Sequence, residues 1–183
     1  MRLETKRLIL RDITKADADD LVEGLNNLKI SKWLAYVRHP YTRKDAKEWI
    51  RRCAKNIRKG KGRTSYDFVI VLKSENEVIG GVGLGEVNRI HGLTGGGIWL
   101  NAKYHGHGYG TEALAGCVKF GFTKLKLRRI ELGFYRGNRA SFRMQKKLGF
   151  RIEGIRRKRY RCMADGRVRD ECITGLLREE WKR

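Results

Sequence analysis

Apolar and polar residues alternate along this chain in two rhythms, one typical of strands and one of helices. Alternating or continuously apolar runs indicate strands over 8–12, 67–72, 78–87, 95–100, 129–135, 150–163 and 167–177. Helical spacing indicates a first helix that ends near 26 after a cap at Thr14, a second that ends near 58 after a cap at Thr42, and two more over about 111–125 and 139–148. A turn at Asp165-Gly166 makes the last two strands a hairpin.

This order of elements, β-α-α-β-β-β-α-β-α-β-β, predicts a mixed α/β sandwich. The 183 residues are 40% hydrophobic, which is enough for one core. The 22 glycines cluster in strands and turns rather than in a linker, so we expect a single domain over 1–183. No apolar run reaches membrane-spanning length, and no signal peptide is visible.

The most informative segment is 98–113, in which a short apolar strand leads through a glycine-rich loop to a helix start. Gly106, Gly108 and Gly110 remove side chains where the backbone must turn sharply. The helix after Thr111 adds unpaired amides and a positive dipole end. The segment therefore predicts a site for a phosphate group.

Two common phosphate-binding motifs do not fit this loop. A P-loop closes with Gly-Lys-Ser/Thr, whereas this loop ends in Gly110-Thr111 and contains no lysine. A dinucleotide fingerprint needs Gly-x-Gly-x-x-Gly, and here the third glycine comes one place early. The acid about twenty residues on, Glu131, lies inside an apolar strand pattern rather than at its end.

Five stretches of the chain together resemble the GNAT N-acetyltransferase superfamily, in particular its RimJ/RimL branch. The loop is similar to the family's Gln/Arg-x-x-Gly-x-Gly/Ala motif, with Gly108 and Gly110 at the small positions and His105 in place of Gln or Arg. Residues 138–141 read Asn-Arg-Ala-Ser, and 147–154 read Lys-Leu-Gly-Phe-Arg-Ile-Glu-Gly. The opening Glu-Thr-Lys-Arg-Leu-Ile-Leu-Arg at 4–11 and the Asp-Gly-Arg-Val-Arg-Asp at 165–170 also match, so the resemblance covers almost the whole chain.

The resemblance implies a single-domain GNAT fold, with helices on both faces of a mixed sheet and two parallel strands splayed around acetyl-CoA. It also implies an N-acetyltransferase whose acceptor amine attacks the thioester directly, with coenzyme A as the product. No metal is expected. The residues implied to contact the coenzyme are Ile98, Trp99, Leu100, His105, Gly106, His107, Gly108, Tyr109, Gly110, Thr111, Asn138 and Ser141.

Candidate catalytic residues follow from the same resemblance. Ser141 matches a serine that protonates the departing thiolate in RimL-like enzymes; the tyrosine that serves other GNAT enzymes is absent, because Gln145 stands at that position. Asn138 and Ser141 have a simpler alternative as the cap and first turn of a helix. Glu86, near the end of a long strand, is the candidate general base, with a solvent-facing strand residue as the alternative. Tyr135 either positions the amine or fills the core.

The net charge of +22 bears on partners and acceptors. It favours RNA, ribosomes or acidic proteins and repels free polyamines, or it marks the solvated surface of a heat-tolerant protein. The preferred acceptor is a protein amino terminus, such as that of a ribosomal protein. A small-molecule amine and a non-catalytic ribosome- or RNA-binding role are the alternatives. The four cysteines form no Cys-x-x-Cys pair, which suits reduced thiols in the cytoplasm, in a monomer or homodimer.

Overall fold

The structure is a computed structural model that describes residues 1–182. Its eight strands are β1 (Arg2–Glu4), β2 (Leu8–Asp12), β3 (Tyr66–Leu72), β4 (Glu77–Asn88), β5 (Leu93–Leu100), β6 (Arg129–Tyr135), β7 (Arg151–Arg161) and β8 (Val168–Leu177). Its helices are α1 (Ala18–Leu25), α2 (Leu28–Ser31), α3 (Arg43–Ile57), α4 (Tyr109–Thr123) and α5 (Arg139–Lys147), with 3-10 turns at Lys15–Asp17, Gly60–Gly62 and Ala102–Tyr104.

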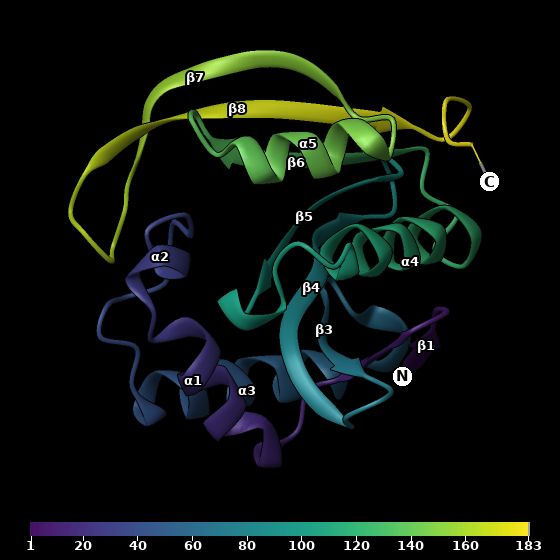
Figure 1. Cartoon of the computed structure of the whole chain (residues 1–183). Helices are drawn as coiled ribbons and strands as arrows, with labels where there is room; N and C mark the ends of the chain where they lie inside the picture. Colours follow the sequence, from purple (N-terminus) through teal and green to yellow (C-terminus); the bar gives the residue numbers. More distant parts are fainter. Residues whose placement is uncertain (183) are drawn as a thin grey trace.

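All eight strands form one mixed sheet in the order β1-β2-β3-β4-β5-β6-β8-β7. Helices α1 to α3 lie together at one end of the molecule, whereas α4 and α5 lie beside the middle and late strands (Figure 1). Strand alternation divides the core between the two faces. In β3, Phe68 and Ile70 pack into the cluster that contains α4, whereas Val69 and Val71 pack into the cluster that contains α1 and α3.

The sheet opens between β5 and β6, its only parallel pair in the described part of the chain. These strands share just two register pairs, Leu93 with Arg129 and Thr94 with Ile130. Beyond them β5 stays paired with β4 as far as Leu100, while β6 pairs with β8 along its whole length. The predicted splay is therefore confirmed, and the sheet has two halves joined at one end of the gap.

The tip of the β7–β8 hairpin contacts the segment after α2. The amide of Met163 donates to the carbonyl oxygen of Ala35 at 3.3 Å. The buried thiol of Cys162 lies 3.6 Å from the carbonyl oxygen of Lys32 and 3.8 Å from that of Leu34. These contacts hold the hairpin tip against the residues that follow α2.

The predicted elements are confirmed, with shifts of about two residues at some ends. Thr14 and Thr42 each form a capping box, with Asp17 and Asp45 respectively. Helix α4 begins at Tyr109, two residues earlier than expected, because Gly108 supplies a left-handed cap. Two short elements, β1 and α2, were not predicted.

Candidate active site

The gap between β5 and β6 offers free main-chain groups from alternate residues of β5. The amide of Asn101 donates to the carbonyl oxygen of Ile79 at 2.8 Å, which fixes this pair as hydrogen-bonded. In an antiparallel ladder the next residue, Leu100, then turns its amide and carbonyl away from β4, as does Ile98. Trp99 turns its main-chain groups toward β4. The groups that can pair with an extended ligand in the gap are therefore the amide and carbonyl of Ile98 and the amide of Leu100, whose carbonyl oxygen already lies 3.0 Å from a ring nitrogen of His105.

The loop after β5 is shaped to surround an anion with backbone amides. Gly106 and Gly108 have φ values of +86° and +80°, a conformation that suits glycine. Nothing lies within 4 Å of a Cβ built on Gly106, so the space beside it is open. Gly108 caps α4, whose first amides follow at Tyr109 and Gly110. A loop of this shape at a helix N-terminus fits a diphosphate.

Hydrogen bonds from residues near the start of the chain hold this loop in place. Glu112, in the first turn of α4, accepts hydrogen bonds from the Thr5 hydroxyl at 2.6 Å and from the backbone and side chain of Arg7, both at 2.7 Å. Arg7 also donates to the His107 carbonyl at 2.9 Å, and its guanidinium lies 4.4 Å from the centre of the Tyr109 ring. Partial burial raises the pKa of Glu112, but these hydrogen bonds outweigh burial and hold that pKa below its usual range.

A cavity of about 810 Å³ connects the gap with the loop. It is lined by every residue predicted to contact the coenzyme except His107. The His107 ring instead stacks on Tyr109 outside the cavity, with ring centres 5.6 Å apart. His105, which departs from the family motif, places a ring nitrogen 3.0 Å from the carbonyl oxygen of Leu100 and so steadies the end of β5.

Ser141 lies at the start of α5 with its hydroxyl proton free. The Gln145 amide donates to the Ser141 hydroxyl oxygen at 3.0 Å. Gln145 is buried, and its own oxygen lies 2.6 Å from the hydroxyl of Thr174, which also lies 3.0 Å from the carbonyl oxygen of Leu132. Because Ser141 accepts this hydrogen bond, its own proton can be donated into the cavity. The capping alternative holds for Asn138, whose side-chain oxygen accepts from the Ser141 amide at 3.1 Å.

Tyr135 provides a second hydroxyl on the same cavity. The residue is 3% exposed, and its hydroxyl is the buried side-chain group without a hydrogen-bond partner among residues 1–182. Burial raises the pKa of this phenol, so it stays protonated. A buried, unpaired donor beside an open cavity suits a site that a ligand completes.

Glu86 lies on a second cavity, of about 850 Å³, between α1, α3 and the sheet. The β4–β5 register breaks between Gly85 and Asn88, and Glu86 adopts a φ of +53° there. A non-glycine residue in this conformation is strained, and such strain collects at functional sites. The bulge thus turns the exposed Glu86 carboxylate out of the strand pattern at the edge of the cavity.

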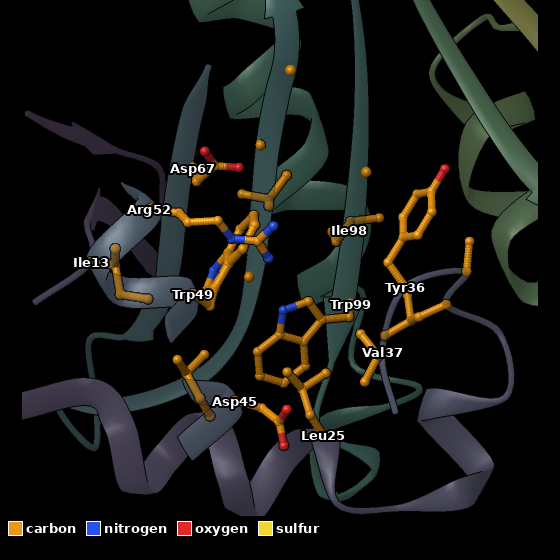
Figure 2. Close-up of a pocket in the computed structure, with 18 of the residues that line it drawn as sticks. Ile13, Leu25, Tyr36, Val37, Asp45, Trp49, Arg52, Asp67, Ile98 and Trp99 are labelled. Atoms are coloured by element: carbon orange, nitrogen blue, oxygen red, sulfur yellow. The ribbon is translucent and has the colours of Figure 1, made fainter. Parts of the chain in front are cut away.

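Aromatic and charged side chains form the walls of this second cavity (Figure 2). Trp49 and Arg52 come from α3, Trp99 from β5 and Tyr36 from the segment after α2. Both cavities are lined by Gly96, Gly97, Ile98 and Trp99 of β5 and by Leu34, Ala35 and Tyr36. The two cavities therefore share β5 and the segment after α2 as a common wall.

Sequence reasoning missed three residues that these sites use. Arg7 and Glu112 lie in recognised motifs, but nothing in the sequence shows that they pair across the fold. Asp67, the second residue of β3, also lines the second cavity. The sequence gives no signal for Asp67, because an acid at the start of an apolar run is also typical of an exposed strand end.

None of the helices in residues 1–182 has the length and apolar character needed to cross a membrane.

Comparisons with known proteins agree with this geometry. Residues 7–151 match the acetyltransferase (GNAT) domain family. The chain is 29% identical over 182 residues to the uncharacterized N-acetyltransferase YnaD of Bacillus subtilis, with 99% of both chains covered. Two solved structures share the fold: Mycobacterium smegmatis RimJ with CoA-disulfide (TM-score 0.83, 24% identity, 96% of this chain and 84% of that one) and a Vibrio cholerae spermidine N-acetyltransferase with CoA and spermine (0.81, 22%, 96% and 98%).

The open gap, the glycine loop and the unpaired Tyr135 hydroxyl all fit a coenzyme that carries a diphosphate and a thioester arm. With the family match over most of its length, the chain belongs to the GNAT acetyltransferase family and is an N-acetyltransferase that uses acetyl-CoA.

Proposed function

We propose that the protein acetylates the primary amine of a compact acceptor that occupies the cavity between α1, α3 and the sheet. The observation that carries this proposal is the wall of β5 shared by the two cavities, because it puts the acceptor beside the coenzyme gap. A cavity of about 850 Å³ with aromatic walls is typical of a site for a small molecule rather than for a long peptide. The solved neighbour with spermine is an example of this fold acting on a small amine.

The chain would contribute mainly position and proton transfer. Acetyl-CoA supplies the acetyl group, with its diphosphate at 105–111 and its arm along Ile98 and Leu100. Glu86 takes a proton from the acceptor's ammonium, directly or through one water, so that the neutral nitrogen can form the new C–N bond. Ser141 donates its hydroxyl proton to the sulfur as the C–S bond breaks, and it is reprotonated, directly or through water, by the second proton that the nitrogen loses as the amide forms. The Asn138 amide group, with its oxygen used as a cap, keeps its NH₂ for the coenzyme.

A protein amino terminus is the second candidate acceptor. Its support is the +22 charge, which suits an enzyme that works on or near ribosomes, and the basic, exposed strand β7. The amino-terminal residues of a flexible chain would then fill the cavity. This second proposal includes binding to RNA or the ribosome, a monomeric or homodimeric state and a cytoplasmic location. The four free, buried cysteines support the cytoplasmic location.

The test is to incubate the purified protein with acetyl-CoA and, separately, a panel of small primary amines and the ribosomal proteins of its host, and to measure intact masses. We expect one acetyl group on a small amine. A single acetyl group mapped to a protein amino terminus would instead establish the second acceptor. If CoA binds but no acceptor gains mass, both proposed acceptor classes are refuted, and RNA binding that weakens steeply with salt would support the binding role.

A further inference from the structure

The acceptor cavity has the opposite sign of charge from the protein as a whole. The chain carries a net charge of +22. The cavity wall contains four carboxylates and two guanidinium groups, namely Asp45, Glu48, Asp67, Glu86, Arg38 and Arg52. A local excess of negative charge inside a cationic protein favours a positively charged ligand at that point.

The floor of the cavity is almost free of side chains. Strand pairing places Asp67 opposite Gly83, and Gly83 opposite Gly97, with Gly85 opposite Gly95 in the next row. These residues share the sheet face that α1 and α3 cover. A Cβ built on Gly85 or Gly97 would have no atom within 4 Å, so the space above the floor is open. Asp67 is the charged side chain at the far edge of this floor.

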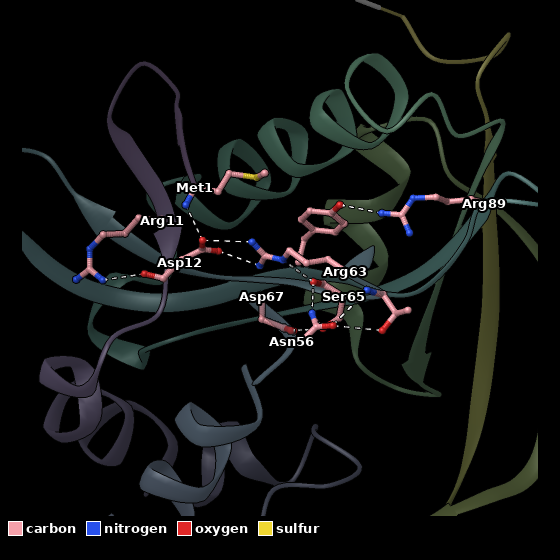
Figure 3. Close-up of polar contacts among 10 residues, drawn as sticks. Met1, Arg11, Asp12, Asn56, Arg63, Ser65, Asp67 and Arg89 are labelled. Atoms are coloured by element: carbon pink, nitrogen blue, oxygen red, sulfur yellow. Dashed lines mark hydrogen bonds and ion pairs between the residues drawn. The ribbon is translucent and has the colours of Figure 1, made fainter. Parts of the chain in front are cut away.

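Neighbouring residues fix the direction of the Asp67 carboxylate. The Ser65 hydroxyl donates to Asp67 Oδ2 at 2.7 Å, and Asn56 of α3 donates to that hydroxyl at 2.9 Å (Figure 3). The second oxygen, Oδ1, lies 3.0 Å from the position that a Cβ on Gly83 would take, so it faces the floor. No hydrogen bond to Oδ1 occurs within residues 1–182.

The charge of Asp67 has no ion-pair partner in the described part of the chain. Arg63, the nearby buried cation, is engaged by both oxygens of Asp12, at 2.9 and 3.2 Å (Figure 3). Arg52 is exposed, and its guanidinium stacks 5.1 Å from the centre of the Trp49 ring. Burial raises the pKa of Asp67, which is the sign of a carboxylate that pays for desolvation without full compensation.

We propose that Asp67 selects the acceptor by binding a second cationic group on it, so that the preferred acceptor is a compact dibasic amine. Its body would lie flat on the glycine floor beside Trp49 and Trp99, and its reacting nitrogen would reach Glu86 and the gap. The floor from β3 to β5 spans two strand spacings, about 10 Å, which sets the separation of the two nitrogens. This inference rests on the proposed transfer to a small amine.

The experiment compares straight-chain diamines of graded length with monoamines of the same length, using the full-length protein and acetyl-CoA. For the wild type we expect kcat/KM to peak at one diamine length and to exceed that of the matched monoamine. The isosteric change Asp67→Asn should lower kcat/KM for that diamine about 10- to 100-fold and change the monoamine value less than about twofold. Affinity for CoA should stay the same. Asp19→Asn, on the exposed face of α1, is the matched control.

Two further variants keep the test decisive if Asp67→Asn folds poorly. Gly97→Val adds side-chain atoms over the open floor without a protein clash and should shift the preferred diamine length. Arg52→Met removes a competing cation and should raise kcat/KM for diamines more than for monoamines. A wild type that treats each matched pair alike, or an Asp67→Asn variant that keeps the diamine preference, overturns the role of Asp67. Transfer to no amine at all, with CoA bound, overturns the proposed small acceptor itself.

Discussion

The coenzyme side and the acceptor side of this protein are built from different parts of the chain. The coenzyme side uses main-chain groups of β5, the glycine loop and the first turn of α4. The acceptor side uses side chains, contributed by α1, α3 and the segment after α2 over a floor of glycines. A site made of backbone depends on conformation and tolerates sequence change, whereas a site made of side chains changes with each substitution. One fold can therefore keep its donor while its acceptor varies.

The comparison predicts two kinds of variant. Changes on the coenzyme side should affect every acceptor equally, because they alter the donor or the shared chemistry. Changes on the acceptor side should alter the ranking of acceptors and leave CoA binding intact.

The largest effect, on CoA affinity, is expected from Gly108→Val, which disrupts the backbone conformation of the coenzyme loop. A β-branched residue is strained at a φ of +80°, and the new Cβ would lie 3.5 Å from the Arg7 guanidinium. We expect CoA affinity, measured by calorimetry, to fall by at least about 100-fold. Gly60→Val is the control, since Gly60 also has a positive φ, +54°, but lies in open space away from both cavities. Unchanged CoA affinity in Gly108→Val would refute the loop assignment.

Ser141→Ala should lower kcat about 100-fold with every acceptor while leaving CoA affinity unchanged, because only the proton donor is removed. Steady-state kinetics with two unrelated amines and a CoA titration measure both quantities. Ser74→Ala, on an exposed turn, is the control. Equal turnover in Ser141→Ala would exclude the acid role of Ser141, and the unpaired Tyr135 hydroxyl would become the next candidate donor.

Arg7→Met should raise the KM for acetyl-CoA about tenfold, since it removes charged hydrogen bonds and leaves the Glu112 carboxylate without its cation near the diphosphate. The KM for S-acetylpantetheine, which lacks the diphosphate, should not change. Adding Glu112→Gln to Arg7→Met should recover part of the loss. Arg2→Met, which removes an exposed ion pair with Glu4, is the control. Equal losses with both donors would mean that Arg7 supports the fold generally rather than the loop.

The smallest effect is a pH dependence of stability on the acceptor side. Burial raises the pKa of Asp17, but hydrogen bonds from Arg11 and Thr14 outweigh it and hold that pKa below its usual range. This contribution is present above the unfolded-state pKa and is lost as pH falls through the folded-state pKa. Urea unfolding at several pH values should show stability falling below about pH 4 in the wild type. Asp17→Asn should be less stable by about 1 kcal/mol near neutral pH and less pH-dependent below it; an identical pH profile would refute the assignment.

The sequence predicted the elements that carry a long periodic pattern and the motifs that work locally. Strand β6 and helix α5 begin where their patterns begin, and the glycine loop has the conformation that its composition requires. Strand β1 was missed because three residues show no alternation, and α2 because four residues make one turn.

What could not be predicted depends on pairs of residues that are distant in the sequence. Asp67 becomes a candidate only when the register sets it opposite Gly83 and Asn56 orients its partner Ser65. Arg7 meets Glu112 across 105 positions, and no local pattern encodes that contact. The strained backbone of Glu86 likewise arises from a break in pairing between two strands.

The gap between β5 and β6 is closed at one end by the two register pairs at Leu93 and Thr94, and the hairpin tip at Cys162 and Met163 fastens the strands beyond the gap to the segment after α2. A gap fixed in this way keeps a set width and does not close around its ligand. A gap of set width selects the acyl group by its size. We expect it to admit an acetyl group and to discriminate against longer acyl chains, whose extra methylenes would have to force apart two halves of one continuous sheet.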